Sequence, residues 1–212
     1  MSLFLGKIHY WLFNKVLWFE GLEDEIIQFA NDNGIDIDKL KAEINFKYGQ
    51  KLPEKNLEEM IDTSNIHGWL QDKINSAEGR MAAWINIILN NNNDYIFELK
   101  KIYKNQGVNA ANEAKGNIDS VTAESIFNSM NDYILDGMPC DRVNEIITSS
   151  EQSIMWRKRI CVHKDIGEGE GISVDIFYKL REELINAFVN EIDNSYEYIK
   201  SEDNIQAIRK RI

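Results

Sequence analysis

The stretch "IHYWLFNK" occupies residues 8–15, and "IHGWLQDK" occupies residues 66–73. Both contain His-x-Trp-Leu-x-x-Lys, although the 212-residue chain has only three histidines and five tryptophans. The two histidines are 58 residues apart (67 − 9), and residues 7–34 laid over 65–92 at this offset show nine identities in 28 positions. The pairs are Ile8/Ile66, His9/His67, Trp11/Trp69, Leu12/Leu70, Lys15/Lys73, Glu20/Glu78, Gly21/Gly79, Ile27/Ile85 and Asn33/Asn91.

The same register continues past this segment, because Asp36/Asp94, Ile44/Ile102 and Gly49/Gly107 also match. Agreement over this length predicts an internal duplication of a two-helix unit, with one copy at 7–49 and the other at 65–107. Two such units would form a pseudo-symmetric helical bundle.

Apolar periodicity near 3.6 residues runs along most of the chain, and we identify no alternating β-branched run bounded by hairpin turns. The sequence therefore predicts an all-α fold, a bundle of about eight to ten helices. Residues 1–212 are expected to form a single compact domain, with the duplication in 1–116 and non-repeated helices in 117–212. Expected helices span 3–32, 36–48, 55–61, 64–90, 93–105, 108–115, 120–136, 139–148, 149–163 and, as a long carboxy-terminal helix, 173–200, with a short tail helix after Asp203.

The net charge and the cysteine content of the chain indicate which partners and which cellular location to expect. The chain carries 35 acidic and 24 basic side chains, a formal net charge of −11, which disfavours binding to nucleic acid. Cys140 and Cys161 are the two cysteines, too few for a disulfide framework, so a reducing, cytoplasmic location is expected.

The amino-terminal stretch "MSLFLGKIHYWLFNKVLWF" is apolar enough to raise the question of a membrane segment. Lys7, His9, Asn14 and Lys15 interrupt it, so no transmembrane segment is predicted. We interpret it as a buried helix, with a helix lying at a membrane surface as the alternative.

A polar stripe is repeated in the two long helices. At 100° per residue, His9 and Glu20 fall within about 20° of each other, and His67 and Glu78 repeat this arrangement. If the helices cross antiparallel, His9 faces Glu78 and His67 faces Glu20. Each pair is then a buried hydrogen-bonded bridge, or a histidine that holds a metal or cofactor; a third reading leaves the residues partly exposed without a special role.

The other matched residues are interpreted as packing residues. Trp11 and Trp69 lie about 200° around the helix from the matched histidines, which favours interhelix packing over a cofactor box. Gly21 and Gly79 are predicted to allow close approach of helices.

The remaining reactive side chains gather in the last third of the chain. Cys140 follows Pro139 and would lie in a first helical turn, where the helix dipole favours a reactive thiolate, so it is the candidate catalytic nucleophile; an inert buried cysteine is the alternative. Cys161 and His163 could bind one metal where a helix has ended. The candidate metal ligands are His9, His67, Glu20, Glu78, Cys161 and His163.

Several well-known sites are excluded by reading the sequence. The chain has no Glu-x-x-His, His-Glu-x-x-His, Gly-x-x-x-x-Gly-Lys-Ser/Thr, Gly-x-Ser-x-Gly or Cys-x-x-Cys. Two functions remain. The first is a helical protein that binds a transition metal or a cofactor such as haem through the repeated histidines, with enzymatic activity undecided. The second is a non-enzymatic interaction protein whose apolar first helix, with Phe4 and Trp18, docks in a homo-oligomer or on a partner.

Overall fold

The computed structural model describes residues 5–201 and 204–211. The chain divides into two compact units, unit 1 in residues 1–96 and 163–174 and unit 2 in residues 97–162 and 175–212. The described residues form seven α-helices and a four-stranded antiparallel sheet, so the prediction of an all-α bundle is wrong. The single-domain organisation stays a prediction.

Unit 1 is helical and is built around two helices of 26 residues each. The amino-terminal residue Phe4, placed on the first helix by the prediction, lies outside the described residues. The helices are α1 (Lys7–Asp32), α2 (Ile37–Tyr48), α3 (Ile66–Asn91) and α6 (Lys164–Gly169), with short 3-10 helices η1 (Leu57–Glu59) and η2 (Asn93–Tyr95).

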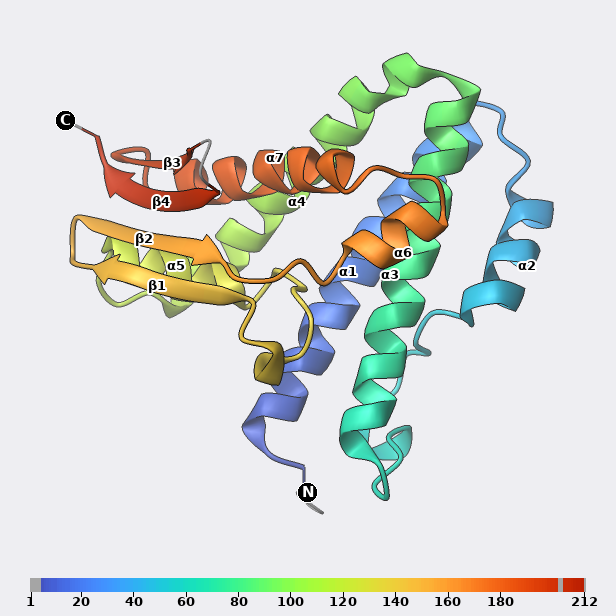
Figure 1. The fold of residues 1–212 in the computed structure, drawn as a ribbon, viewed down its shortest axis with the longest axis horizontal. Coiled ribbons are helices and arrows are strands. Elements are labelled where there is room, and N and C mark those ends of the chain that lie inside the picture. Colours follow the sequence, from blue (N-terminus) through green and yellow to red (C-terminus); the bar gives the residue numbers. More distant parts are fainter. Residues whose placement is uncertain (1–4, 202–203, 212) are drawn as a thin grey trace. The chain divides into compact units, whose positions relative to one another are not determined.

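Helices α1 and α3 pack side by side and run parallel (Figure 1). The His9 and His67 rings, near the two helix starts, have centroids 5.6 Å apart, and further along Glu20 and Glu23 of α1 meet Arg80 of α3. The antiparallel crossing is therefore wrong. In a parallel pair, residues at equivalent heights meet, which is why His9 contacts His67 instead of Glu78.

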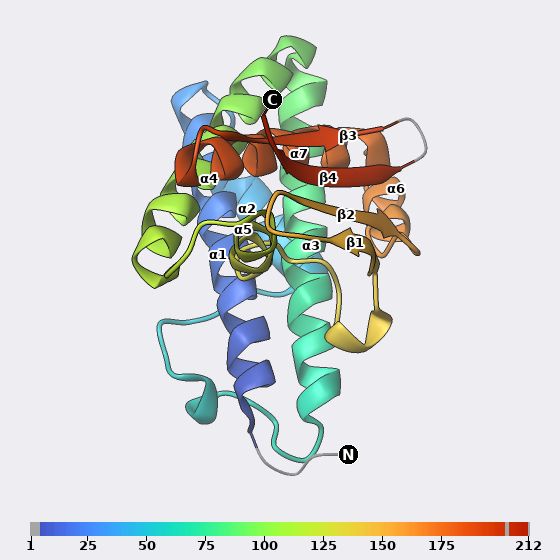
Figure 2. The same cartoon turned by 90° about the vertical axis from the view of Figure 1, so that its left-hand side faces the viewer.

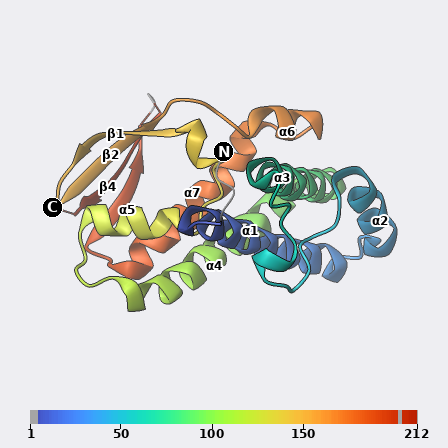
Figure 3. The same ribbon diagram turned by 90° about the horizontal axis from the view of Figure 1, so that it is seen from below.

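Unit 2 combines three helices with the sheet, whose strand order is β1-β2-β4-β3 (Figure 2). Figure 3 shows α5 and α7 along one face of this sheet. The elements are α4 (Ile96–Ala114, its first residue in unit 1), η3 (Lys115–Asn117), α5 (Ala123–Asn131), η4 (Pro139–Asp141), β1 (Asn144–Ser149), β2 (Ser153–Lys158), α7 (Val174–Ile192, its first residue in unit 1), β3 (Tyr196–Lys200) and β4 (Ile205–Lys210).

The sheet arises from a period of two in the sequence. Ile154 and Trp156 of β2 are buried, and they pair with Ile208 and Gln206 of β4, which are buried on the same face. The alternate residues face away from the helices, and Arg157 among them is exposed. Aromatic packing continues across the buried face, where the Trp156 ring lies 4.7 Å from Phe127 of α5.

Four predicted helices are corrected by this sheet. The segment 139–148 is a three-residue 3-10 helix followed by β1, the segment 149–163 contains β2, and the helix expected over 173–200 ends at Ile192 before β3. The tail helix expected after Asp203 is replaced by β4. The alternation is masked in the sequence because Gln206, a polar residue, takes an inward position, while Ile146 on the edge strand β1 is 52% exposed. Burial, not residue type alone, identifies these strands.

Glycines with positive φ follow two of the helices of unit 1. Gly34 and Gly49 have φ of 77° and 84° and follow α1 and α2, as the sequence predicts. The expected break near Gly107 is absent, since α4 is continuous there. A Cβ on Gly107 would lie 2.2 Å from the carbonyl oxygen of Leu184 on α7, so this glycine serves a close helix approach instead of a stop.

The duplicated segments have the same order of elements, a 26-residue helix followed by a shorter one, α1–α2 and α3–α4. However, α3 belongs to unit 1 and α4, apart from its first residue, to unit 2. The second copy is therefore divided between the two units, whereas the first copy lies within unit 1.

Candidate functional site

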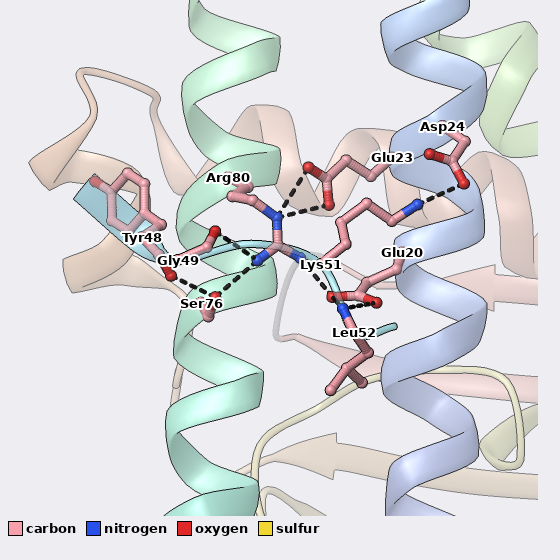
Figure 4. Close-up of polar contacts among 9 residues, drawn as sticks. All are labelled: Glu20, Glu23, Asp24, Tyr48, Gly49, Lys51, Leu52, Ser76 and Arg80. Atoms are coloured by element: carbon pink, nitrogen blue, oxygen red, sulfur yellow. Dashed lines mark hydrogen bonds and ion pairs between the residues drawn. The ribbon is translucent and has the colours of Figure 1, made fainter. Parts of the chain in front are cut away.

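A buried ionic cluster joins α1 to α3 in unit 1 (Figure 4). The Arg80 side chain is fully buried; its Nε lies 3.0 and 3.1 Å from the Glu23 carboxylate oxygens and its Nη2 lies 2.5 Å from Glu20 Oε1. The guanidinium also donates to Ser76 Oγ at 2.7 Å. Burial raises the pKa of both carboxyl groups, although Arg80 opposes this shift.

This cluster fixes the position of the loop after α2 as well. The backbone N–H of Leu52 donates to Glu20 at 3.1 and 3.2 Å, and Arg80 Nη1 reaches the carbonyl oxygen of Gly49 at 3.3 Å. Every polar group of the cluster is used in holding α1, α3 and this loop together. Its role is therefore structural.

The second repeated carboxylate has a different partner. The Glu78 carboxylate lies 3.1 Å from Nδ1 of His163, and both side chains are buried within unit 1. Buried His–Glu bridges were one reading of the repeated stripe, but the partners predicted for Glu20 and Glu78 are wrong. Glu20 pairs with Arg80 and not with a histidine, and this pairing was not predicted from the sequence.

The repeated glycines also differ from each other. At Gly79 a Cβ would lie 2.2 Å from the Tyr48 ring, whereas Gly21 has nothing within 4 Å. Close packing thus explains Gly79 and not Gly21. The Trp-Lys pairs of the repeat do match: Lys15 Nζ lies 3.6 Å from the centre of the Trp11 ring, and the equivalent pair in α3 is separated by 5.3 Å.

The six candidate metal ligands do not gather at one point. His9 meets His67, Glu20 meets Arg80, and Glu78 meets His163, while Cys161 belongs to unit 2. Over residues 5–201 and 204–211, no group of three or more His, Cys, Asp or Glu could hold a metal ion. The six residues therefore do not form one metal centre in this structure, while a cofactor held by His9 and His67 stays a prediction.

The candidate nucleophile Cys140 lies in η4, with Pro139 at the first helical position. Its side chain is exposed, not buried, and η4 is only three residues long. The helix expected from 139 to 148, whose dipole was the argument for a reactive thiol, is not formed.

Unit 2 contains a half-open cavity of about 210 Å³ between α7 and the sheet. This volume equals the liquid volume of about seven water molecules. Among the residues that the structure describes, four basic side chains and one acidic side chain line it, in a chain whose net charge is −11. The lining comprises Lys158, Arg159, Ile160, Cys161, Tyr178, Arg181, Glu182, Ile185, Tyr198, Lys200, Asn204 and Gln206.

Two of the basic side chains share one carboxylate at the cavity wall. Lys158 Nζ lies 2.7 Å from Asp136 Oδ2, and Arg181 Nη1 lies 2.7 Å from Asp136 Oδ1. Arg181 also donates to the carbonyl oxygen of Leu135 at 2.6 Å. Burial lowers the pKa of Lys158, although Asp136 opposes this. The cluster therefore carries more positive than negative charge close to the cavity.

Tyr178 lies at the centre of the charged side chains. Its ring centre is 5.4 Å from Lys158 Nζ, 5.9 Å from Lys200 Nζ and 6.0 Å from Arg181 Cζ. The Tyr178 hydroxyl donates to Cys161 Sγ at 3.2 Å. Burial raises the pKa of Tyr178, so its hydroxyl stays protonated and remains a donor at neutral pH.

Strands β3 and β4 of the sheet also line the cavity. Tyr198 of β3 donates its hydroxyl to Gln206 Oε1 of β4 at 2.9 Å, and both side chains are buried. This hydrogen bond explains why a glutamine occupies an inward position of β4. Ile160 and Ile185 add apolar surface to the lining. The cavity thus combines cationic, aromatic and aliphatic groups.

Unit 1 contains a second hollow that lacks these properties. It measures about 460 Å³ and is more open, and the side chains along it include Glu58, Glu59 and Tyr10. The Tyr10 hydroxyl already donates to Glu58 at 2.5 Å. Because the described lining of this hollow holds no basic group, we place the candidate binding site in unit 2.

Most residues that line the unit 2 cavity were not identified as site residues from the sequence. Tyr178 and Arg181 are three residues apart, which places them on one face of α7, and this spacing was the available signal. Lys158 ends β2, so its proximity to α7 becomes visible only once the strands are recognised. Cys161 was singled out, but as a metal ligand.

Comparison with protein families, with curated proteins and with solved structures finds no match to this chain. Among the described residues, no helix has both the length and the apolar character required to cross a membrane.

Proposed function

We propose that unit 2 is a binding module for small organic anions that carry an apolar group. The supporting observation is the charge of the cavity wall, where Lys158 and Arg181 share the single carboxylate of Asp136. Burying a charge without a partner is unfavourable, so an anion that enters the cavity relieves the excess positive charge.

Two further cations extend this positive surface toward solvent. Lys200 pairs with Glu182, whereas the side chain of Arg159 has no ion-pair partner among the described residues. Arg159 is exposed and lines the cavity, so it can meet an incoming carboxylate in the planar, two-bond geometry that guanidinium groups favour.

The apolar part of the ligand has its own surroundings. The rings of Tyr178 and Tyr198 and the side chain of Ile185 line the cavity, and an aromatic or branched aliphatic group would displace water from them. A small acid with one ring or a short branched chain satisfies both the charge and the cavity volume. Highly charged polymers such as nucleic acid do not fit a cavity of about 210 Å³.

Isothermal titration calorimetry with phenylacetate and its neutral amide, phenylacetamide, tests this function. We expect phenylacetate to bind and phenylacetamide to bind at least about tenfold more weakly, because the amide lacks the charge. Arg159→Gln should weaken phenylacetate binding. Arg157→Gln is the matched control, since Arg157 lies on β2 two residues before Arg159, pairs with Glu145 and does not line the cavity.

Equal binding of the acid and the amide, or equal loss in the Arg159 and Arg157 variants, would refute the proposal. A panel of small aliphatic and aromatic carboxylates then ranks the preferred apolar group.

A homo-oligomer formed through α1 stays a separate prediction. Ile8, Tyr10 and Leu17 are 48%, 37% and 40% exposed. At 100° per residue Leu17 lies within about 20° of Tyr10 but on the opposite side of the helix from Ile8. Most other large apolar residues of α1 are buried within the chain. The exposed residues of α1 therefore do not form one apolar patch, and the cavity of unit 2 is better supported as a functional site.

A further inference from the structure

We infer that the cavity of unit 2 takes small 2-oxo acids and that Cys161 adds to their carbonyl carbon as a nucleophile. This inference rests on the proposed function, because the cations that bind the carboxylate also bring the carbonyl group to the thiol. It adds a covalent step and a narrower class of ligand.

The first argument is the position of the thiol in the cavity. Cys161 is exposed and lines the same cavity as Lys158, Arg159 and Arg181. A thiol in such surroundings meets anionic reagents at a higher local concentration than a thiol on an acidic surface. A ligand whose carboxylate is held by these cations presents its adjacent carbon to the lining.

The second argument is the hydrogen bond between Tyr178 and Cys161. The Tyr178 hydroxyl lies 3.2 Å from Sγ, so a carbonyl oxygen on a carbon bonded to Sγ comes within reach of the same hydroxyl. Tyr178 packs among Lys158, Lys200 and Arg181, which keeps its ring in place and favours negative charge developing near its hydroxyl.

The proposed step balances without an oxidant or a metal. Sulfur of the Cys161 thiolate attacks the carbonyl carbon, a C–S bond forms, and the carbonyl π pair moves onto oxygen. That oxygen takes a proton from Tyr178, which recovers the proton released by the thiol through solvent. The product is a hemithioacetal or hemithioketal, and the reverse step returns the thiol and the 2-oxo acid.

Cys140 provides an internal control for this chemistry. It is the other free cysteine, it is exposed, and it does not line the cavity. Differences between the two thiols therefore report the cavity, while both experience the same buffer, temperature and net charge of the chain.

The first measurement is alkylation by iodoacetate and by neutral iodoacetamide, with each cysteine followed by peptide mass spectrometry. We expect the iodoacetate-to-iodoacetamide rate ratio at Cys161 to exceed that at Cys140 by about tenfold, the lower end of the range for electrostatic attraction. Arg159→Gln should reduce this excess, and Arg157→Gln should leave it unchanged. Equal ratios at the two cysteines would overturn the inference.

The second measurement uses ¹³C-labelled glyoxylate, the smallest 2-oxo acid, and follows a new carbon resonance for the hemithioacetal. We expect the resonance in the unaltered protein and in Cys140→Ser, and its loss in Cys161→Ser. Tyr178→Phe keeps the aromatic ring and should slow formation of the adduct. An adduct that persists in Cys161→Ser, or no adduct in the unaltered protein, would overturn the inference.

The titration with phenylacetate separates the two proposals. Phenylacetate has no carbonyl carbon beside its carboxylate, so Cys161→Ser should bind it as the unaltered protein does. If phenylacetate binds and glyoxylate forms no adduct, the covalent step is wrong and the binding function stands. If neither binds, both are wrong.

Discussion

Replacing Arg80 with leucine leaves the carboxylates of Glu20 and Glu23 buried without the guanidinium that they share. Arg80 makes two contacts of 3.0 and 3.1 Å with Glu23 and one of 2.5 Å with Glu20. Removing one partner from a buried ion pair costs about 3–5 kcal/mol. We expect Arg80→Leu to lower the free energy of unfolding by this amount at pH 8.

The loss should depend on pH in a defined direction. Burial raises the folded-state pKa of Glu20 and Glu23 above the ordinary value of 4.5. A carboxyl with a raised folded pKa destabilises the fold progressively as the pH rises from about 4.5 through that pKa. Without Arg80 both pKa values rise further, so the loss at pH 5 should be smaller than at pH 8 by at least about 1 kcal/mol.

Urea denaturation followed by far-ultraviolet circular dichroism at pH 5 and pH 8 measures both effects. Arg157→Leu is the control, because its exposed pair with Glu145 is worth at most about 1 kcal/mol. Arg80→Leu combined with Glu20→Gln and Glu23→Gln should recover part of the stability at pH 8, since no buried charge remains. A loss below about 1 kcal/mol at pH 8, or an equal loss at both pH values, would refute the reasoning.

Two further predictions concern unit 2 and the glycines. Asp136→Asn removes the carboxylate that the buried Arg181 shares with the partly buried Lys158, so the free energy of unfolding should fall by about 3–5 kcal/mol. Saturating phenylacetate should restore more of this loss than phenylacetamide does. Urea titrations with each compound check this, and equal effects of the two would count against it. Gly107→Ala should lower the free energy of unfolding by about 1–3 kcal/mol, because its Cβ would lie 2.2 Å from the Leu184 carbonyl oxygen. Gly21→Ala has nothing within 4 Å of its Cβ and should stabilise the protein by about 0.5–1 kcal/mol. Thermal denaturation compares the two variants, and effects of the same sign would contradict the described packing.

The helical elements of unit 1 were predictable because their signals are local. Gly34 and Gly49 mark the ends of α1 and α2, and the repeat places α1 and α3. The direction of packing was not predictable, because the apolar stripes of α1 and α3 allow parallel and antiparallel contact alike. In the parallel arrangement Arg80 meets Glu20 and Glu23, which are 60 and 57 residues away in the sequence.

The strands were missed because their alternation is incomplete. Gln206 occupies an inward position that looks polar in the sequence, and it is tolerated there because Tyr198 donates to it. The cavity of unit 2 could not be assembled without these strands, since Lys158 and Tyr178 meet only across β2 and α7. Cys161 could be selected as a reactive residue, but its surroundings depend on that non-local packing.

The central claim, that an organic anion binds in the cavity of unit 2, is tested most directly by a ¹⁵N–¹H correlation spectrum recorded during titration with phenylacetate. We expect saturable shifts confined to amides in and beside the cavity, such as those of Cys161, Tyr178 and Gln206, and none with phenylacetamide at the same concentration. Shifts that do not saturate, or that scatter over exposed lysines such as Lys39 and Lys101, would contradict the claim.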